Sequence, residues 1–253
     1  MTASRKRNPE SAGSAPSQEA AEETPRLLTR PLDALAFLLP LILFYELGCL
    51  LLASHSSEAA QDRVVAFHLL QLFFELFGST GVWMPGLAVV AVLLGTQLVS
   101  GRPWIINRRR VALMYAESAL LAVPLLVFNQ ILRASPGSTG VQDSLWADLV
   151  LGVGAGVYEE LVFRLVLISV LVMIGHDLLG ISNSTTLIAA VILSALAFSA
   201  HHHPPLGSEP FAMDRFLFRA AAGAYLGVLF VFRGYGPAAG THAAYNVLVT
   251  LLA

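Results

Sequence analysis

The stretch of sequence that decides the fold is Leu145–Ile174, LWADLVLGVGAGVYEELVFRLVLISVLVMI. It is mostly apolar, yet it contains Glu159, Glu160 and Arg164. A transmembrane helix needs about 20 apolar residues, so the stretch can cross a bilayer but is too long for one straight span. We therefore predict a helix that is tilted, bent or divided. A charge at the bilayer centre costs about 2.5–3.5 kcal/mol on insertion scales, so three ionisable groups in one span indicate a functional site.

The composition of the whole chain agrees with a membrane protein. Of the 253 residues, 56% are hydrophobic and 13% are charged, and the mean hydropathy is +0.69, whereas soluble domains are about 45–50% apolar. The net charge of −2 and the single Lys6 exclude a nucleic-acid partner. Cys49 is the only cysteine, which excludes a disulfide framework and a cysteine-based zinc site. The sequence predicts an all-α, polytopic transmembrane helical bundle whose partner is the lipid bilayer.

Hydropathy predicts the spans, and composition predicts the domains. The predicted spans are Leu32–Ala53, Val82–Ser100, Val111–Leu132, Leu145–Ile174, Leu187–His201, Phe216–Phe232 and Ala238–Leu252. Residues 64–78 predict an interfacial amphipathic helix or a short extra span, so the count is seven or eight. Residues 1–30 predict a disordered polar tail, residues 31–144 the N-terminal transmembrane helices and residues 145–253 a C-terminal core. The sequence contains no internal repeat, which argues against an inverted-repeat transporter.

The positions of the arginines predict the orientation in the membrane. Arg102 and Arg108–Arg110 make the loop before the third predicted span the most basic short loop, and the tail carries Arg5, Lys6, Arg7, Arg26 and Arg30. Cytoplasmic loops carry an excess of Lys and Arg, so we expect the tail and this loop to be cytoplasmic. The Lys-poor composition favours a bacterial source, in which the chain would lie in the cytoplasmic membrane.

Glu159 and Glu160 follow a glycine-rich run, and Arg164 lies four residues after Glu160. On a helix, Glu160 and Arg164 share a face and can form an ion pair, whereas Glu159 points about 100° away. A structural Glu–Arg bridge without chemistry would explain that pair but not Glu159. We therefore predict that Glu159 faces a different cavity, where its carboxylate is a candidate general base.

Two further pairs of residues lie in apolar helices. Phe198 and His202 are four residues apart at the end of one predicted helix, and His242 and Asn246 are four apart in the last. A His and an Asn on one helix face can donate to a developing oxyanion or hold helices together by hydrogen bonds. Of the three consecutive histidines at 201–203, at most one or two can converge on a point, because adjacent helical residues diverge.

In this order, the three motifs resemble those of the CPBP family of intramembrane proteases. This family includes the type II CAAX prenyl endopeptidases and bacteriocin-processing or immunity proteins. Its pattern is E-E-x-x-x-R, then F-x-x-x-H, then H-x-x-x-N, and the resemblance covers residues 145–253. It implies an endopeptidase that hydrolyses peptide bonds of a protein or peptide substrate in a cytoplasm-facing cavity within the membrane.

The resemblance also implies roles for individual residues. Glu159 with His202 would activate the attacking water, and His242 and Asn246 would stabilise the oxyanion. The supporting residues would be Glu160, Arg164 and Phe198.

Three alternatives stay open at this point. Glu159, His202 and His242 would be the ligands of a divalent metal such as Zn²⁺, or they would act as acid–base groups without a metal. The polar cluster would also suit a non-catalytic membrane scaffold or immunity protein, which keeps it for packing. A proton-coupled carrier, the least favoured reading, would use the cluster as a relay.

Overall fold

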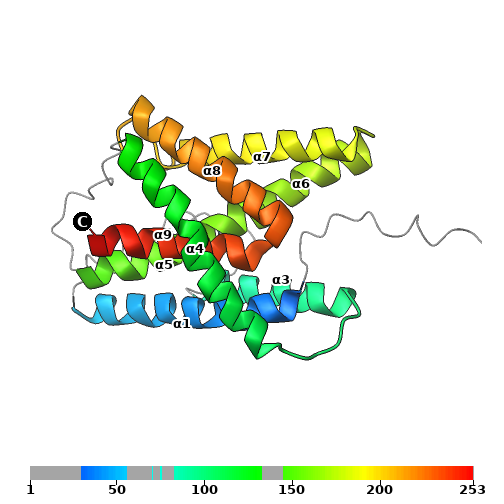
Figure 1. The fold of residues 1–253 in the computed structure, drawn as a ribbon, viewed down its shortest axis with the longest axis horizontal. Helices are drawn as coiled ribbons and strands as arrows, with labels where there is room; N and C mark the ends of the chain where they lie inside the picture. Colours follow the sequence, from blue (N-terminus) through cyan, green and yellow to red (C-terminus); the bar gives the residue numbers. More distant parts are fainter. Residues whose placement is uncertain (1–29, 56–69, 71–74, 76–82, 133–144, 253) are drawn as a thin grey trace, which may run out of the picture.

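A computed structural model describes residues 30–55, 70, 75, 83–132 and 145–252 of the chain. These residues form helices and no strand, which confirms the predicted all-α bundle (Figure 1). The helices are α1 (Pro31–His55), α3 (Met84–Val99), α4 (Arg108–Leu132), α5 (Leu145–Glu160), η2 (Leu161–Ile168), α6 (Ser169–Val172), η3 (Met173–Leu178), α7 (Asn183–Ala200), α8 (Met213–Arg233) and α9 (Tyr235–Leu252).

The number of helices that can span a membrane is lower than predicted. Among the described residues, five helical segments are long and apolar enough: Pro31–Leu52, Arg108–Ile131, Leu145–Leu178, Asn183–Ala200 and Met213–Arg233. Of the other two predicted spans, α3 has only 16 residues, and the site residues His242 and Asn246 lower the hydropathy of α9. The predicted helix at residues 64–78 lies, apart from Leu70 and Glu75, outside the described residues, as does the tail before residue 30.

The long apolar stretch that decides the fold forms one uninterrupted helical segment of 34 residues, Leu145–Leu178. It is therefore longer than the about 20 residues that cross the hydrocarbon core of a bilayer. It is α-helical up to Glu160 and then π-helical over η2. In Figure 1 its first part lies beside α9 and its later part approaches α7. Because π-helical turns are often found at functional sites, the change of helix type directly after the two glutamates is notable.

Glycines allow α5 to approach its neighbours closely. A Cβ atom at Gly156 would collide with the backbone of Ala243 in α9, and one at Gly154 would collide with the ring of Tyr45 in α1. Small residues permit this kind of backbone approach between membrane helices. The close contact with α9 places the glutamates at the end of α5 opposite the polar residues of α9.

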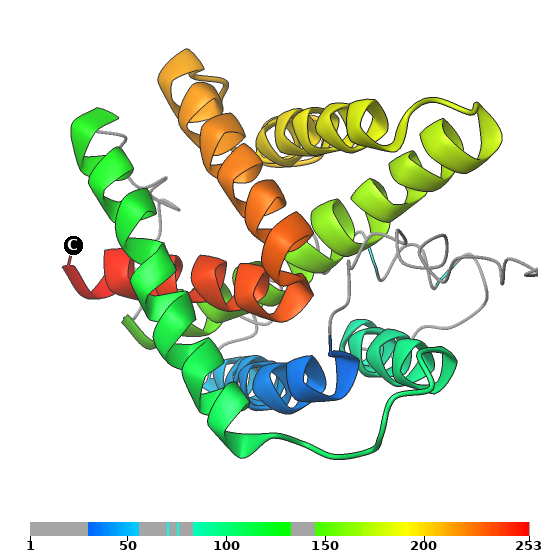
Figure 2. The ribbon, with the colours of Figure 1, turned by 45° about the vertical axis from the view of Figure 1, so that its right-hand side comes forward.

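The helix α9 lies in the middle of the bundle, between the α7–α8 pair and α1 (Figures 1 and 2). One end of the bundle is marked by ion pairs: Arg110 at the start of α4 lies 2.6 Å from Asp33 at the start of α1. Arg233 at the end of α8 lies 2.7 Å from Glu117 of α4. The starts of α1 and α4 and the junction of α8 with α9 therefore lie toward the same end, which we call the basic end.

Candidate active site

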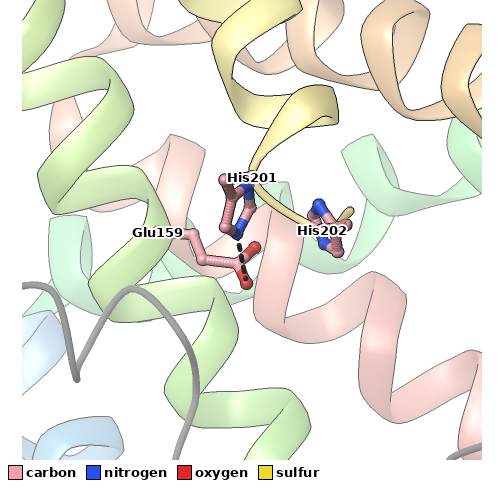
Figure 3. A group of neighbouring side chains, drawn as sticks. All are labelled: Glu159, His201 and His202. Atoms are coloured by element: carbon pink, nitrogen blue, oxygen red, sulfur yellow. Dashed lines mark ion pairs between the residues drawn. The ribbon is translucent and has the colours of Figure 1, made fainter. Parts of the chain in front are cut away.

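Glu159 lies at the centre of the polar cluster. Its side chain is buried, and one carboxylate oxygen, Oε1, lies 3.5 Å from Nε2 of His201. The other, Oε2, lies 3.8 Å from Nε2 of His242. Figure 3 shows the carboxylate of Glu159 and the ring of His201 pointing toward each other, with His202 alongside. Among the described residues, the ionisable groups within 4 Å of the Glu159 carboxylate are imidazoles.

Glu160 has a different environment although it is the next residue. Its Oε1 forms an ion pair with Nη1 of Arg164 at 2.8 Å and accepts a hydrogen bond from Nδ1 of His242 at 2.9 Å. Arg164 also donates from Nη2 to the carbonyl of Gly223 at 3.2 Å, and its guanidinium lies 4.2 Å from the centroid of the Phe198 ring. The predicted Glu160–Arg164 pair is thus confirmed. It is completely buried and holds three motifs together.

In three of the histidines, the ring nitrogen Nδ1 lies within hydrogen-bond distance of an acceptor oxygen. His201 and His202 both direct Nδ1 at the carbonyl of Phe198, at 2.5 and 3.0 Å, and His242 directs Nδ1 at Glu160. Since carbonyl and carboxylate oxygens only accept, Nδ1 carries the proton in each ring. In a neutral ring Nε2 is then an acceptor, so Nε2 of His201 and Nε2 of His242 face the carboxylate of Glu159, at 3.5 and 3.8 Å, without a hydrogen bond to it.

The structure brings His201 into the cluster more closely than the sequence indicated. Ligand atoms of Glu159, His201 and His202 all lie within 4.8 Å of one another, a grouping that could hold a metal ion. The predicted set had His242 in place of His201. Nε2 of His201 is buried and has no hydrogen-bond partner among the described residues. His203 lies apart, with Nδ1 at 3.1 Å from the carbonyl of Glu209.

A cavity of about 220 Å³ adjoins the cluster. The four residues predicted to be catalytic, Glu159, His202, His242 and Asn246, all line it. Nδ2 of Asn246 donates to the carbonyl of Gly152 at 2.9 Å, which fixes the orientation of the amide at the wall. The remaining wall is mostly apolar, and its residues are Leu125, Asn129, Ala155, Phe198, Arg215, Phe218, Arg219, Ala222, Leu226, Tyr245 and Val249.

His202 is the imidazole of the 201–203 run that reaches this cavity. Burial is the largest influence on it and lowers its pKa to about 3, although the charge of Glu159 acts in the opposite direction. The ring is therefore neutral at neutral pH. His201, by contrast, is buried behind the wall against Phe163, with ring centroids 4.6 Å apart.

Comparison with known proteins agrees with this geometry. Residues 141–248 match the family model described as type II CAAX prenyl endopeptidase Rce1-like, and the match contains all three motifs. This part of the chain belongs to that family. No curated protein and no solved structure matches the chain. The predicted family is confirmed, and the Rce1-like domain together with the five apolar helices makes the chain an integral membrane protein.

Sequence reasoning missed two arginines of the Rce1-like domain. Arg215 and Arg219 both line the cavity, and they are four residues apart at the start of α8. The spacing was a usable signal, because residues four apart share a helix face. It was overlooked because neither arginine belongs to one of the three motifs.

The cavity lies away from the basic end. Asn129 near the end of α4, Arg215 near the start of α8 and Val249 near the end of α9 all line it. The ion pairs of the basic end involve the opposite ends of α4 and α8. The cavity and the basic end therefore lie toward opposite ends of the bundle.

Proposed function

We propose that the chain is an intramembrane endopeptidase in which Glu159 activates a water molecule for attack on a peptide bond. The observation that carries the proposal is the contrast between two adjacent carboxylates. Glu160 is bound by a guanidinium, whereas Glu159 faces the Nε2 atoms of imidazoles beside a cavity. A carboxylate among groups that exchange protons is suited to general base catalysis.

In the proposed reaction, a peptide carbonyl lies in the cavity between Glu159 and Asn246. Glu159 accepts a proton from water while the water oxygen attacks the carbonyl carbon. The resulting oxyanion receives hydrogen bonds from Nδ2 of Asn246 and from Nε2 of His242 in its protonated form, which the Glu160 carboxylate stabilises. The proton on Glu159 then passes to the leaving amide nitrogen, the C–N bond breaks, and a carboxylate and an amine are released. Neutral His202 orients the water.

A divalent metal is compatible with part of this site. Two imidazoles and a carboxylate suit Zn²⁺, and the ligands we infer are Glu159, His201 and His202, the grouping within 4.8 Å. The buried Nε2 of His201, without a hydrogen-bond partner, fits a role as a ligand. Zn²⁺ would polarise the carbonyl and acidify water. Elemental analysis of the purified protein and of a His201→Ala variant tests this assignment independently of activity.

The proposed base is tested by Glu159→Gln, which keeps the size of the side chain. The purified protein in detergent is first screened on a library of quenched peptides, and kcat/KM is then measured on the best member. We expect a loss of about 10²–10⁴-fold, the usual contribution of a general base. Glu117→Gln is the control, because Glu117 pairs with Arg233 outside the cavity and its variant keeps activity. An unchanged rate in Glu159→Gln would show that Glu159 is not the base.

A further inference from the structure

The loop between α7 and α8 directs a carboxylate at the arginines of the cavity. Arg219 donates to Glu209 from both terminal nitrogens, with Nη2 at 2.6 Å from Oε1 and Nη1 at 3.0 Å from Oε2. Nη1 of Arg215 lies 3.8 Å from Oε2 of the same carboxylate. Two guanidiniums thus face one carboxylate, and the planar fork of Arg219 matches it in a bidentate pair.

The same arginines belong to the wall of the cavity, whereas Glu209 does not. Arg215 and Arg219 continue along α8 into Ala222 and Leu226, so that one face of the helix runs from cationic to apolar along the wall. In the described part of the wall, these two are the arginines, and there is no lysine. A substrate in the cavity therefore meets this positive charge at one place.

The backbone places Glu209 beside the proposed catalytic residues. The amide of Glu209 donates to the carbonyl of His202 at 3.2 Å, and the Glu209 carbonyl lies 3.1 Å from Nδ1 of His203. Partial burial raises the pKa of Glu209, but hydrogen bonds from Arg219 outweigh this and hold the pKa below its usual value. The carboxylate is thus an anion, tied by its backbone to His202 and by its side chain to the cavity wall.

We propose that Arg215 and Arg219 form a subsite for a carboxylate of the peptide substrate, and that Glu209 occupies the subsite until the substrate displaces it. This proposal rests on the proposed endopeptidase activity. The exchange replaces one carboxylate on the same fork by another, so the charge-assisted hydrogen bonds are conserved. The side chain of Glu209 is 27% exposed and can move into solvent as it leaves.

The apolar part of the cavity wall determines which substrate side chains can lie next to the carboxylate. Phe218, Ala222 and Leu226 come from α8, and Leu125 and Val249 from the facing helices. A segment with apolar side chains and a carboxylate a few residues from the scissile bond fits these surfaces. The carboxylate comes either from the C-terminus of the substrate or from an acidic side chain, and the two sources are separated by experiment.

The test compares three forms of the best-cleaved quenched peptide: a free C-terminal acid, a C-terminal amide, and an amide with an added internal Glu. For the wild-type protein, we expect kcat/KM for one carboxylate form to exceed that of the plain amide about 10–100-fold, as for hydrogen bonds to charged groups. Arg219→Gln abolishes this preference, and Glu209→Gln lowers KM for the preferred form alone. Arg233→Gln, at the basic end, keeps the preference.

A second measurement removes the dependence on catalysis. Fluorescence anisotropy measures the binding of labelled acid and amide peptides to Glu159→Gln protein, with and without Arg219→Gln or the milder Arg219→Lys. A carboxylate preference that disappears with Arg219→Gln supports the subsite even if no peptide is cleaved, in which case the proposed activity alone fails. Equal binding of all forms, or a preference unaffected by Arg219→Gln, would overturn the subsite.

Discussion

Two cavities in the described part of the chain both contain carboxylates and arginines and differ in how the carboxylates are partnered. The cavity at the basic end is larger, about 540 Å³, and its wall includes Asp33 and Glu117. Asp33 lies against Arg110, and Glu117 against Arg233. An arginine stays charged at any ordinary pH, so each of these carboxylates is paired with a permanent positive charge.

The smaller cavity, of about 220 Å³, is different because Glu159 faces imidazoles. An imidazole can exchange a proton, whereas a guanidinium does not lose one at ordinary pH. Volume alone would favour the cavity at the basic end over the one that is lined by residues of the three motifs. The comparison teaches that the partner of each carboxylate is the more informative feature.

The largest expected difference between the two ends is the side of the membrane that each faces. The arginine-rich end should be cytoplasmic, and Asn129 in the cavity wall lies 19 residues, or about 28 Å, along α4 from Arg110. We expect the cavity to open away from the cytoplasm. In a Cys49→Ala background, Leu206→Cys between α7 and α8 should react with an impermeant maleimide in intact cells.

The matched control is Ile105→Cys before α4, which should react only after lysis. Both native side chains are exposed, 56% for Leu206 and 74% for Ile105, so access to the reagent is comparable apart from the membrane. The reverse pattern, in which Ile105→Cys reacts in intact cells and Leu206→Cys reacts only after lysis, would show that the cavity faces the cytoplasm.

The second prediction concerns the two kinds of Arg–Glu pair. Arg164→Met leaves the buried charge of Glu160 without its guanidinium, so we expect a loss of about 3–5 kcal/mol in the free energy of unfolding. Arg233→Met breaks the exposed pair with Glu117 and should cost about 1 kcal/mol or less. Denaturant unfolding in mixed micelles measures both. Similar losses would mean that burial does not distinguish the pairs.

The third prediction concerns the close contact of α5 with α9. In Gly156→Ala, the new methyl group meets the backbone of Ala243, and such overpacking costs about 1–3 kcal/mol. Activity should fall as well, because the contact positions Glu159 opposite His242. Gly95→Ala in α3 is the control, since a Cβ there has nothing within 4 Å. Thermal unfolding of both variants tests the difference, and an equally stable Gly156→Ala protein would contradict it.

Local features of the sequence predicted much of this structure. The predicted helix Leu32–Ala53 is observed at Pro31–His55, and Leu187–His201 at Asn183–Ala200, because an apolar stretch of this length has few other states in a membrane. The Glu160–Arg164 pair was also predictable, because helical spacing alone brings the two side chains together.

Contacts between helices were not predictable in the same way. The sequence did not indicate that His201 would approach Glu159, since this contact depends on where α7 ends relative to α5. The bond between His242 and Glu160 joins residues 82 positions apart and depends on the packing of α5 against α9. These contacts depend on how the helices pack against one another, and the spacing of residues along one helix does not predict that packing.

The smallest expected effect is the pH dependence of the Glu209–Arg219 pair. The folded-state pKa of Glu209 is below its usual value of 4.5. The pair therefore stabilises the folded state above pH 4.5, and this contribution is lost as the pH falls through the lowered pKa. A partly exposed pair contributes about 0–1 kcal/mol, so wild-type protein should exceed Glu209→Gln by this amount at neutral pH. The measurement is the difference in unfolding free energy across the acid range.

The control is Arg219→Gln, which removes the partner of Glu209 and should lower the free energy of unfolding by the same amount. In the Arg219→Gln background, the further change Glu209→Gln should cause no additional loss. A difference that persists at a pH below the lowered pKa would show that Glu209 acts through the backbone contacts of its loop instead of through its charge.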